Sequence, residues 1–195
     1  MAFVPRLSEN SPTAMRPDNP WWYSSGNIYY GSYPHTYGMP NCTCYCYGRT
    51  GEILGNFEVN LPANDAGEWL NDVMYAGILS YGYAPKLGGI MVYRDRPNAY
   101  VHNAGHVSQV EQINSDGSII TSNSGWQNPA YFWTETVAPD PSDSSRNYLS
   151  PWMTNSTHDY IYQGCIYVYD EPTPPTPTPT RRTRLPIWML LKYGI

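Results

Sequence analysis

Apolar residues recur at helical spacing in the first half of the chain and at alternate positions in the second half. Pro40 and Asn41 are typical of a helix start, and the segment after them predicts a first helix over residues 42–54, CTCYCYGRTGEIL. The pattern of residues 60–77, NLPANDAGEWLNDVMYAG, predicts a second helix that ends at Gly77.

The second predicted helix has its own start signal and apolar face. Asn64 or Asp65 can cap its first turn, because a short polar side chain accepts hydrogen bonds from unpaired backbone N–H groups. Trp69, Val73 and Ala76 then follow at helical spacing, which indicates one buried face.

Strands are expected beyond residue 87, where the hydrophobic period becomes two. Four segments have this period and are bounded by Gly, Pro, Asn or Asp: GGIMVYR (88–94), GHVSQVEQI (105–113), GSIITSN (117–123) and DYIYQGCIYVY (159–169). The sequence NSDGS between the second and third segments favours a hairpin turn, since Asp-Gly tolerates positive φ. Helices followed by an antiparallel sheet predict an α+β fold.

Composition divides the 195 residues into four parts. Residues 1–20 are rich in Pro, Ser and Asn and are expected to be extended, and residues 21–170 form the folded domain. Residues 171–180, EPTPPTPTPT, predict a stiff polyproline II linker. Residues 181–195 are a short basic and apolar tail, too short to be a domain.

The charge and the termini exclude several classes of protein. The net charge is −5, and residues 1–180 carry seven basic and sixteen acidic side chains, which argues against nucleic-acid binding. The N-terminus lacks the charged start and apolar run of a signal peptide, and no stretch is apolar enough to span a bilayer. We therefore expect synthesis in a reducing cytosol, where disulfides are disfavoured. The nineteen tyrosines suit both packing and a polar cleft for a sugar or peptide.

Three of the four cysteines lie at alternate positions in NCTCYCYGR, residues 41–49. A zinc site is disfavoured, because structural zinc sites usually take Cys-x2-Cys pairs and Cys44 lies off the helical face that Cys42 and Cys46 share. A disulfide within the run has poor geometry on a helix. Cys42 alone lies in the first helical turn, where N–H groups and the helix dipole favour a thiolate. It is the candidate nucleophile.

A cysteine nucleophile needs a histidine base and a group that orients the base. His106 opens a predicted strand directly after Gly105, and Glu111 lies on the opposite face of that strand. Across the Asp-Gly turn, Asn123 can accept the imidazole N–H through its amide oxygen. Structural roles for His106 at a sheet edge and for Asn123 in a turn remain open at this point.

Together these stretches resemble the CHAP family, the cysteine- and histidine-dependent amidohydrolases/peptidases related to papain-like and NlpC/P60 enzymes. Its nucleophile motif, (Q/N)-C-T-x-Y-x-x-x-R, is matched by Asn41, Cys42, Thr43, Tyr45 and Arg49. Three further stretches resemble later family segments: YAPKLGGIMVY (83–93), GHVSQVEQINSDGSIITSNSGW (105–126) and YIYQGCIYVY (160–169). The likeness extends over roughly residues 21–170.

The resemblance implies a papain-like arrangement of helices on an antiparallel sheet, with Cys42 as nucleophile and His106 as general base and acid. It assigns orientation of His106 to Asn123, where many relatives carry Glu, and oxyanion binding to the backbone of Cys42 with Asn41. We also expect Tyr45 and Trp126, which lie in the matching stretches, to bind substrate. We expect no cofactor and no metal; residues 19–40 contain no Asp or Glu that could form the calcium site of some relatives.

The resemblance further implies hydrolysis of an amide in bacterial peptidoglycan, at the N-acetylmuramoyl–L-alanine bond or in the stem peptide or cross-bridge. A domain without a signal, followed by a linker and a tail, looks like a bacteriophage endolysin that acts from the host cytoplasm after a holin opens the membrane. A virion-borne lysin and a wall- or glycan-binding module without catalysis are the alternatives. The tail, residues 181–195, could contact wall polymers or a membrane surface.

Overall fold

The computed structural model describes residues 3–7, 19–30, 38–99, 103–126 and 132–170. Within these ranges the helices are α2 (Cys42–Leu54) and α3 (Trp69–Ala76), with short 3₁₀ helices η1 (Ala66–Glu68), η2 (Ser144–Arg146) and η3 (Pro151–Met153). The strands are β1 (Ser80–Gly82), β2 (Ile90–Asp95), β3 (His106–Ile113), β4 (Ile119–Asn123), β5 (Trp133–Val137) and β6 (Tyr160–Tyr167). They form one antiparallel sheet in the order β1-β6-β2-β3-β4-β5, which confirms the α+β prediction.

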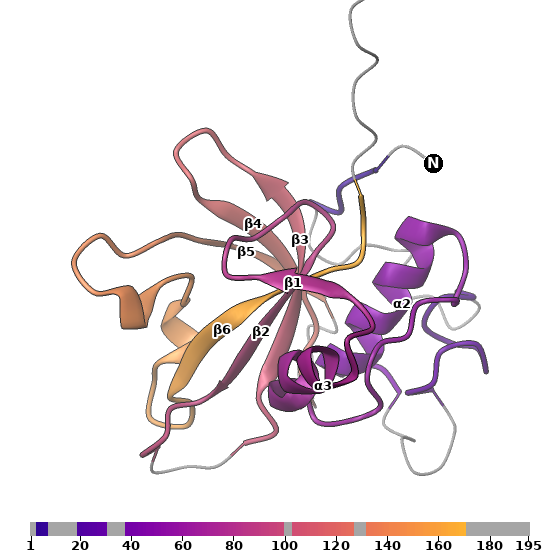
Figure 1. Cartoon of the computed structure of the whole chain (residues 1–195), viewed down its shortest axis with the longest axis horizontal. Helices are drawn as coiled ribbons and strands as arrows, with labels where there is room; N and C mark the ends of the chain where they lie inside the picture. Colours follow the sequence, from indigo (N-terminus) through magenta and orange to yellow (C-terminus); the bar gives the residue numbers. More distant parts are fainter. Residues whose placement is uncertain (1–2, 8–18, 31–37, 100–102, 127–131, 171–195) are drawn as a thin grey trace, which may run out of the picture.

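The sheet is covered on both faces (Figure 1). The helices α2 and α3 lie on one face, and the segment with η2 and η3 lies on the other side. Successive side chains of a strand point to opposite faces, so β2 contributes to two cores. Ile90 and Val92 pack with the helices, whereas Met91 and Tyr93 pack with Met153 of η3. All four of these β2 side chains are fully buried.

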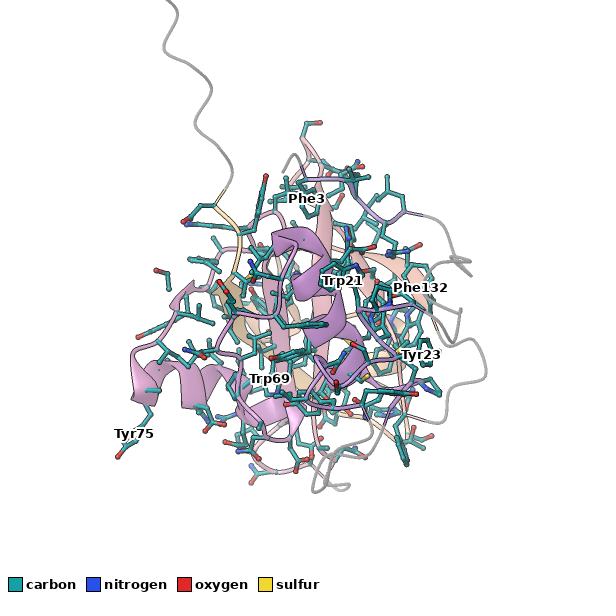
Figure 2. The ribbon with its side chains drawn as sticks, turned by 90° about the vertical axis from the view of Figure 1, so that its right-hand side faces the viewer. Phe3, Trp21, Tyr23, Trp69, Tyr75 and Phe132 are labelled. Carbon is teal, nitrogen blue, oxygen red and sulfur yellow. The ribbon has the colours of Figure 1, made fainter. Side chains whose placement is uncertain are left out.

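Helix α2 has the predicted bounds and is buried along almost its whole length. Asn41 caps it: Oδ1 accepts the backbone N–H of Thr43 (2.9 Å) and of Cys44 (3.0 Å). Figure 2 shows Trp21 and Phe132 beside this helix, and Tyr75 pointing into solvent from α3. Because a loop and the sheet both cover α2, its position relative to β3 is tightly fixed.

The second helix starts differently from the prediction. Asp65 makes no side-chain capping bond, and the turn η1 separates it from the first residue of α3. The Asn64 amide bonds to the Asp65 N–H (2.8 Å) and to Asp72 (3.1 Å) instead. The expected cap by either residue is therefore wrong, although Gly77 ends the helix in the left-handed region as predicted, with φ 63°.

All four predicted strands are confirmed as β2, β3, β4 and β6. The Asp-Gly turn joins β3 to β4: Gly117 has φ 83°, and the Asn114 N–H donates to the Ser118 carbonyl at 2.8 Å. The strands β1 and β5 were not predicted.

Residues 3–7 lie against α2 and β3, where Arg6 binds Glu52 at 2.7 Å and its N–H donates to Glu111 at 2.8 Å. The predicted linker and tail, residues 171–195, fall outside the described residues, as does most of the segment 1–20. Among the helices that the structure describes, none has the length and apolar character needed to cross a bilayer.

Candidate active site

A cleft of about 890 Å³ opens where the first turn of α2 meets the first residue of β3. Both layers of the fold contribute to its walls. Its lining includes Asn41, Cys42, Thr43, Asp65, His106, Trp126, Trp133, Trp152, His158 and Tyr160. The predicted nucleophile and the predicted base therefore line one cavity, although 63 residues and several elements separate them in the chain.

Cys42 is the first residue of α2, and its buried side chain forms part of the cleft wall. Burial raises the pKa of Cys42 to about 11, while the backbone N–H groups of Val107, Thr43 and Cys42 itself act in the opposite direction. The N–H groups at the helix start lower this pKa, as expected, but the desolvation of the buried thiol outweighs them. Contact with the Val107 N–H also places the sulfur beside the residue that follows His106.

His106 is held at the start of β3 by backbone geometry and by one hydrogen bond. Gly105 has φ 78°, and a Cβ there would lie 2.5 Å from the backbone nitrogen of Gly67, so only glycine allows this close entry into the strand. Nε2 of His106 lies 3.0 Å from Oδ1 of Asn123, and the Asn123 amide nitrogen donates to Thr121 at 3.1 Å. Nε2 therefore carries the proton, and Nδ1 keeps a lone pair.

Burial also sets the protonation state of the base. It lowers the pKa of His106 to about 4, against the hydrogen bond to Asn123, which raises it, and together with the charge of His158. At neutral pH the resting pair is consequently a thiol and a neutral imidazole. Such a pair can transfer the proton only as the sulfur attacks, which is general-base catalysis.

The remaining predicted site residues divide into two that line the cleft and one that does not. Asn41 lines it, with Oδ1 committed to the helix cap. Trp126 lines it and is 56% exposed. Tyr45 is fully buried, stacks on Trp22 at 5.6 Å and donates to Ser122 at 2.8 Å. Assigning Tyr45 to substrate binding is therefore wrong, since it has no exposed surface and supports the core instead.

Arg49, the last residue of the motif, has a structural role. Its Nε donates to Oε1 of Glu111 at 2.9 Å and one terminal nitrogen donates to Oε2 at 2.7 Å. Glu111 also accepts the Ser122 hydroxyl at 2.6 Å, and Ser122 precedes Asn123. This buried ion pair joins α2 to β3 and β4 below the cleft. It also confirms that Glu111 points away from His106.

The aromatic wall of the cleft was missed from the sequence. Trp133 in β5, Trp152 in η3, His158 and Tyr160 all line it, and all come from the last third of the domain. The alternation of Trp133, Glu135 and Val137 could have indicated β5. No short-range signal places Trp152 beside His106, because the long connection after β5 brings it there.

The other cysteines are not part of the cleft lining. Cys44, Cys46 and Cys165 are fully buried free thiols. Across the described ranges, no three His, Cys, Asp or Glu side chains converge on a position that could hold a metal ion. Cys44 and Cys46 act as small core residues on α2.

Comparison with known proteins agrees with this geometry. Residues 29–125 match the family model of the CHAP domain. Over 93 residues the chain is 32% identical to an N-acetylmuramoyl-L-alanine amidase domain-containing protein of Staphylococcus aureus, covering 48% of this chain and 14% of that protein.

A crystal structure of an N-acetylmuramoyl-L-alanine amidase from Staphylococcus aureus aligns with a TM-score of 0.41 and 28% identity, over 51% of this chain and 29% of that one. The chain thus spans less than a third of the length of either relative. The matched residues 29–125 contain Cys42, His106 and Asn123, and the chain carries a CHAP domain.

Proposed function

We propose that this chain is a peptidoglycan hydrolase that cleaves an amide bond through Cys42 and His106. The observation that carries the proposal is that Cys42 and His106 line one cleft within the CHAP match, with His106 hydrogen-bonded to the buried Asn123. The amidase name of the Staphylococcus aureus relative supports the N-acetylmuramoyl–L-alanine bond over a stem or cross-bridge bond.

The proposed reaction follows from the protonation states in the cleft. Nδ1 of His106 takes the proton of the Cys42 thiol as the sulfur attacks the amide carbonyl. The backbone N–H of Cys42 and the amide nitrogen of Asn41 stabilise the oxyanion. His106 then protonates the leaving amine, and water, deprotonated by His106, releases the acyl group from Cys42. Asn123 keeps the ring in the reactive tautomer throughout.

The shape of the cleft supports a polymeric, polar substrate. Its walls combine exposed or partly exposed aromatic rings, including Trp126 and Trp133, with the polar side chains of Asp65 and His158. Aromatic faces pack against sugar rings and peptide stems, while the polar groups remain available for hydrogen bonds.

The test is wall clearing by the purified chain and three variants. Wild type should clear a suspension of Gram-positive walls, whereas Cys42→Ala and His106→Ala should not. Wild type and both of these variants should still sediment with the walls. Asn123→Ala should lower kcat by at least about ten-fold, because the imidazole loses its orienting acceptor. Equal clearing by Cys42→Ala would contradict the enzymatic proposal and leave a wall-binding module.

We further propose that the enzyme is a bacteriophage endolysin that acts from the host cytoplasm after holin release. The order of folded domain, Pro/Thr linker and basic tail supports this. Expression in a susceptible host should cause lysis only when a holin is co-expressed. Truncation after Asp170 tests the tail: a loss of salt-dependent binding to walls or to anionic vesicles is expected if residues 181–195 target the enzyme.

A further inference from the structure

Glu135 is a largely buried carboxylate beside the cleft, and the proposed reaction does not use it. It lies on β5, where Asn123 pairs with Trp133 across the ladder and Thr121 pairs with Glu135. Trp133 and Glu135 therefore share the sheet face that carries His106 and Asn123. Burial raises the pKa of Glu135, because a charged carboxylate is costly away from water. Hydrogen-bond donors are therefore needed to stabilise its charged form.

The partners of Glu135 are the indole groups that surround the base. Nε1 of Trp152 donates to Oε2 of Glu135 at 2.9 Å. The indole N–H of Trp133 and the Ser150 hydroxyl lie near enough to lower the pKa of this carboxylate, against the larger effect of burial. Oε1 of Glu135 has no hydrogen-bond partner among the described residues, so the bond from Trp152 is its main support. The two indoles are nearly perpendicular, at 81° with centroids 5.8 Å apart.

Trp152 in turn contacts His106 more closely than any other ring that the structure describes around it. The centroids lie 4.9 Å apart and the planes are at 89°, while Trp133 lies nearly parallel to the imidazole at 6.2 Å and 17°. The hydrogen bond to Asn123 fixes one atom of the imidazole but leaves the ring free to tilt about that bond. A perpendicular indole on one side and a parallel one nearby remove this freedom and exclude water.

We propose that Glu135 is a positioning residue: by holding Trp152, it fixes the plane of His106 and keeps its Nδ1 directed at Cys42 in a dry pocket. This inference rests on the proposed function, because it assigns His106 the role of base. Glu135 acts as a hydrogen-bond acceptor here and takes no part in proton transfer. The interaction is a chain of three groups from β5 through η3 to β3.

The pH profile of kcat/KM can detect this arrangement in its acid limb, the low-pH range in which activity falls as His106 becomes protonated. His106 faces Cys42 from α2, Tyr93 from β2 and His158 before β6, and Glu135 on β5 acts on it through Trp152. Burial is the main reason that its pKa is low. A displaced Trp152 admits water, which raises the pKa of His106 and moves the acid limb of kcat/KM to higher pH. A purely structural role of Glu135 would lower stability without moving this limb.

The experiment compares Glu135→Met, Glu135→Gln and Trp152→Phe, with Thr136→Met on the opposite face of β5 as the matched control. Glu135→Met keeps the length and removes the acceptor, so kcat should fall by about ten-fold or more with KM within about two-fold. The acid limb should move to higher pH. Glu135→Gln keeps an acceptor for Trp152 and should stay within about two-fold of wild type in kcat.

Two readouts make the result independent of hydrolysis and of folding failure. The first is the rate of Cys42 alkylation by iodoacetamide, measured by peptide mass spectrometry across pH. Its acid limb should also move to higher pH in Glu135→Met, even if the chain does not hydrolyse peptidoglycan. If circular dichroism shows that Glu135→Met is unfolded, Trp152→Phe, which keeps a ring and loses the N–H, replaces it. An unchanged limb and kcat in the folded variant, or equal damage by Glu135→Gln, would overturn the proposal.

Discussion

Removing the carboxylate of Glu111 should destabilise the fold far more than removing any exposed ion pair. Arg49 and Glu111 are both almost completely buried, and two hydrogen bonds join them at 2.9 and 2.7 Å. Glu111→Leu leaves the guanidinium with Glu52, the Val4 carbonyl and the Phe3 ring, and takes the acceptor from the Ser122 hydroxyl and from the Arg6 N–H. Breaking a buried pair by removing one partner costs about 3–5 kcal/mol.

That loss can be measured by urea unfolding at pH 7, with circular dichroism as the signal. For a domain of this size it corresponds to a fall in Tm of roughly 6–20 °C. The control is Arg146→Ala, which removes an exposed pair to Asp140 at 3.7 Å and should change the stability far less, because solvent screens such a pair. The double variant Arg49→Leu/Glu111→Leu should lose less than the sum of the two single variants. A loss below about 1 kcal/mol for Glu111→Leu would refute the structural role given to this motif arginine.

Three further predictions concern the site and its surroundings. Gly105→Ala should cost more stability than Gly117→Ala, because both have positive φ (78° and 83°) but a Cβ clashes with backbone only at Gly105; equal thermal melts would contradict this. The kcat/KM profile should be flat near neutral pH and fall as the pH drops through about 4, where His106 becomes protonated and can no longer accept the Cys42 proton; an acid limb at 6.5 would be inconsistent with the buried base. Cys44→Ala should keep wall-clearing activity within a few-fold while Cys42→Ala abolishes it, and equal loss in both would reopen the metal interpretation.

The sequence predicted the fold correctly where local signals and burial agree. The bounds of α2 follow from Asn41, a good cap, and from Gly55, which ends the helix, and the four predicted strands are bounded by turn-forming residues. The strand β1 has only three residues and no period to detect. The prediction that Asn64 or Asp65 caps α3 was wrong, because residue types do not distinguish the intervening 3₁₀ turn η1 from a turn of α-helix.

For the site, sequence reasoning worked for residues within one hairpin and failed for long-range packing. His106 and Asn123 lie on the two strands of one hairpin, so the Asp-Gly turn predicts that they come close. The β-bulge between Val110 and Gln112 then sets the register that puts both on one face, and no sequence pattern predicted it. Tyr45 was misplaced because the face of α2 that reaches the cleft depends on Trp22, which covers the helix from a distant loop. The pKa of Cys42 depends on how deeply neighbouring segments bury it, a quantity that no local pattern contains.

Digestion of purified Gram-positive peptidoglycan, with mass spectrometry of the newly formed ends, tests the central claim most directly. Wild-type enzyme should release soluble fragments with one new type of amine: an L-alanine amine for an amidase, or a stem or cross-bridge amine for an endopeptidase. Cys42→Ala should release none. Absence of new amine ends with the folded wild-type chain, or the same ends with Cys42→Ala, would contradict the account.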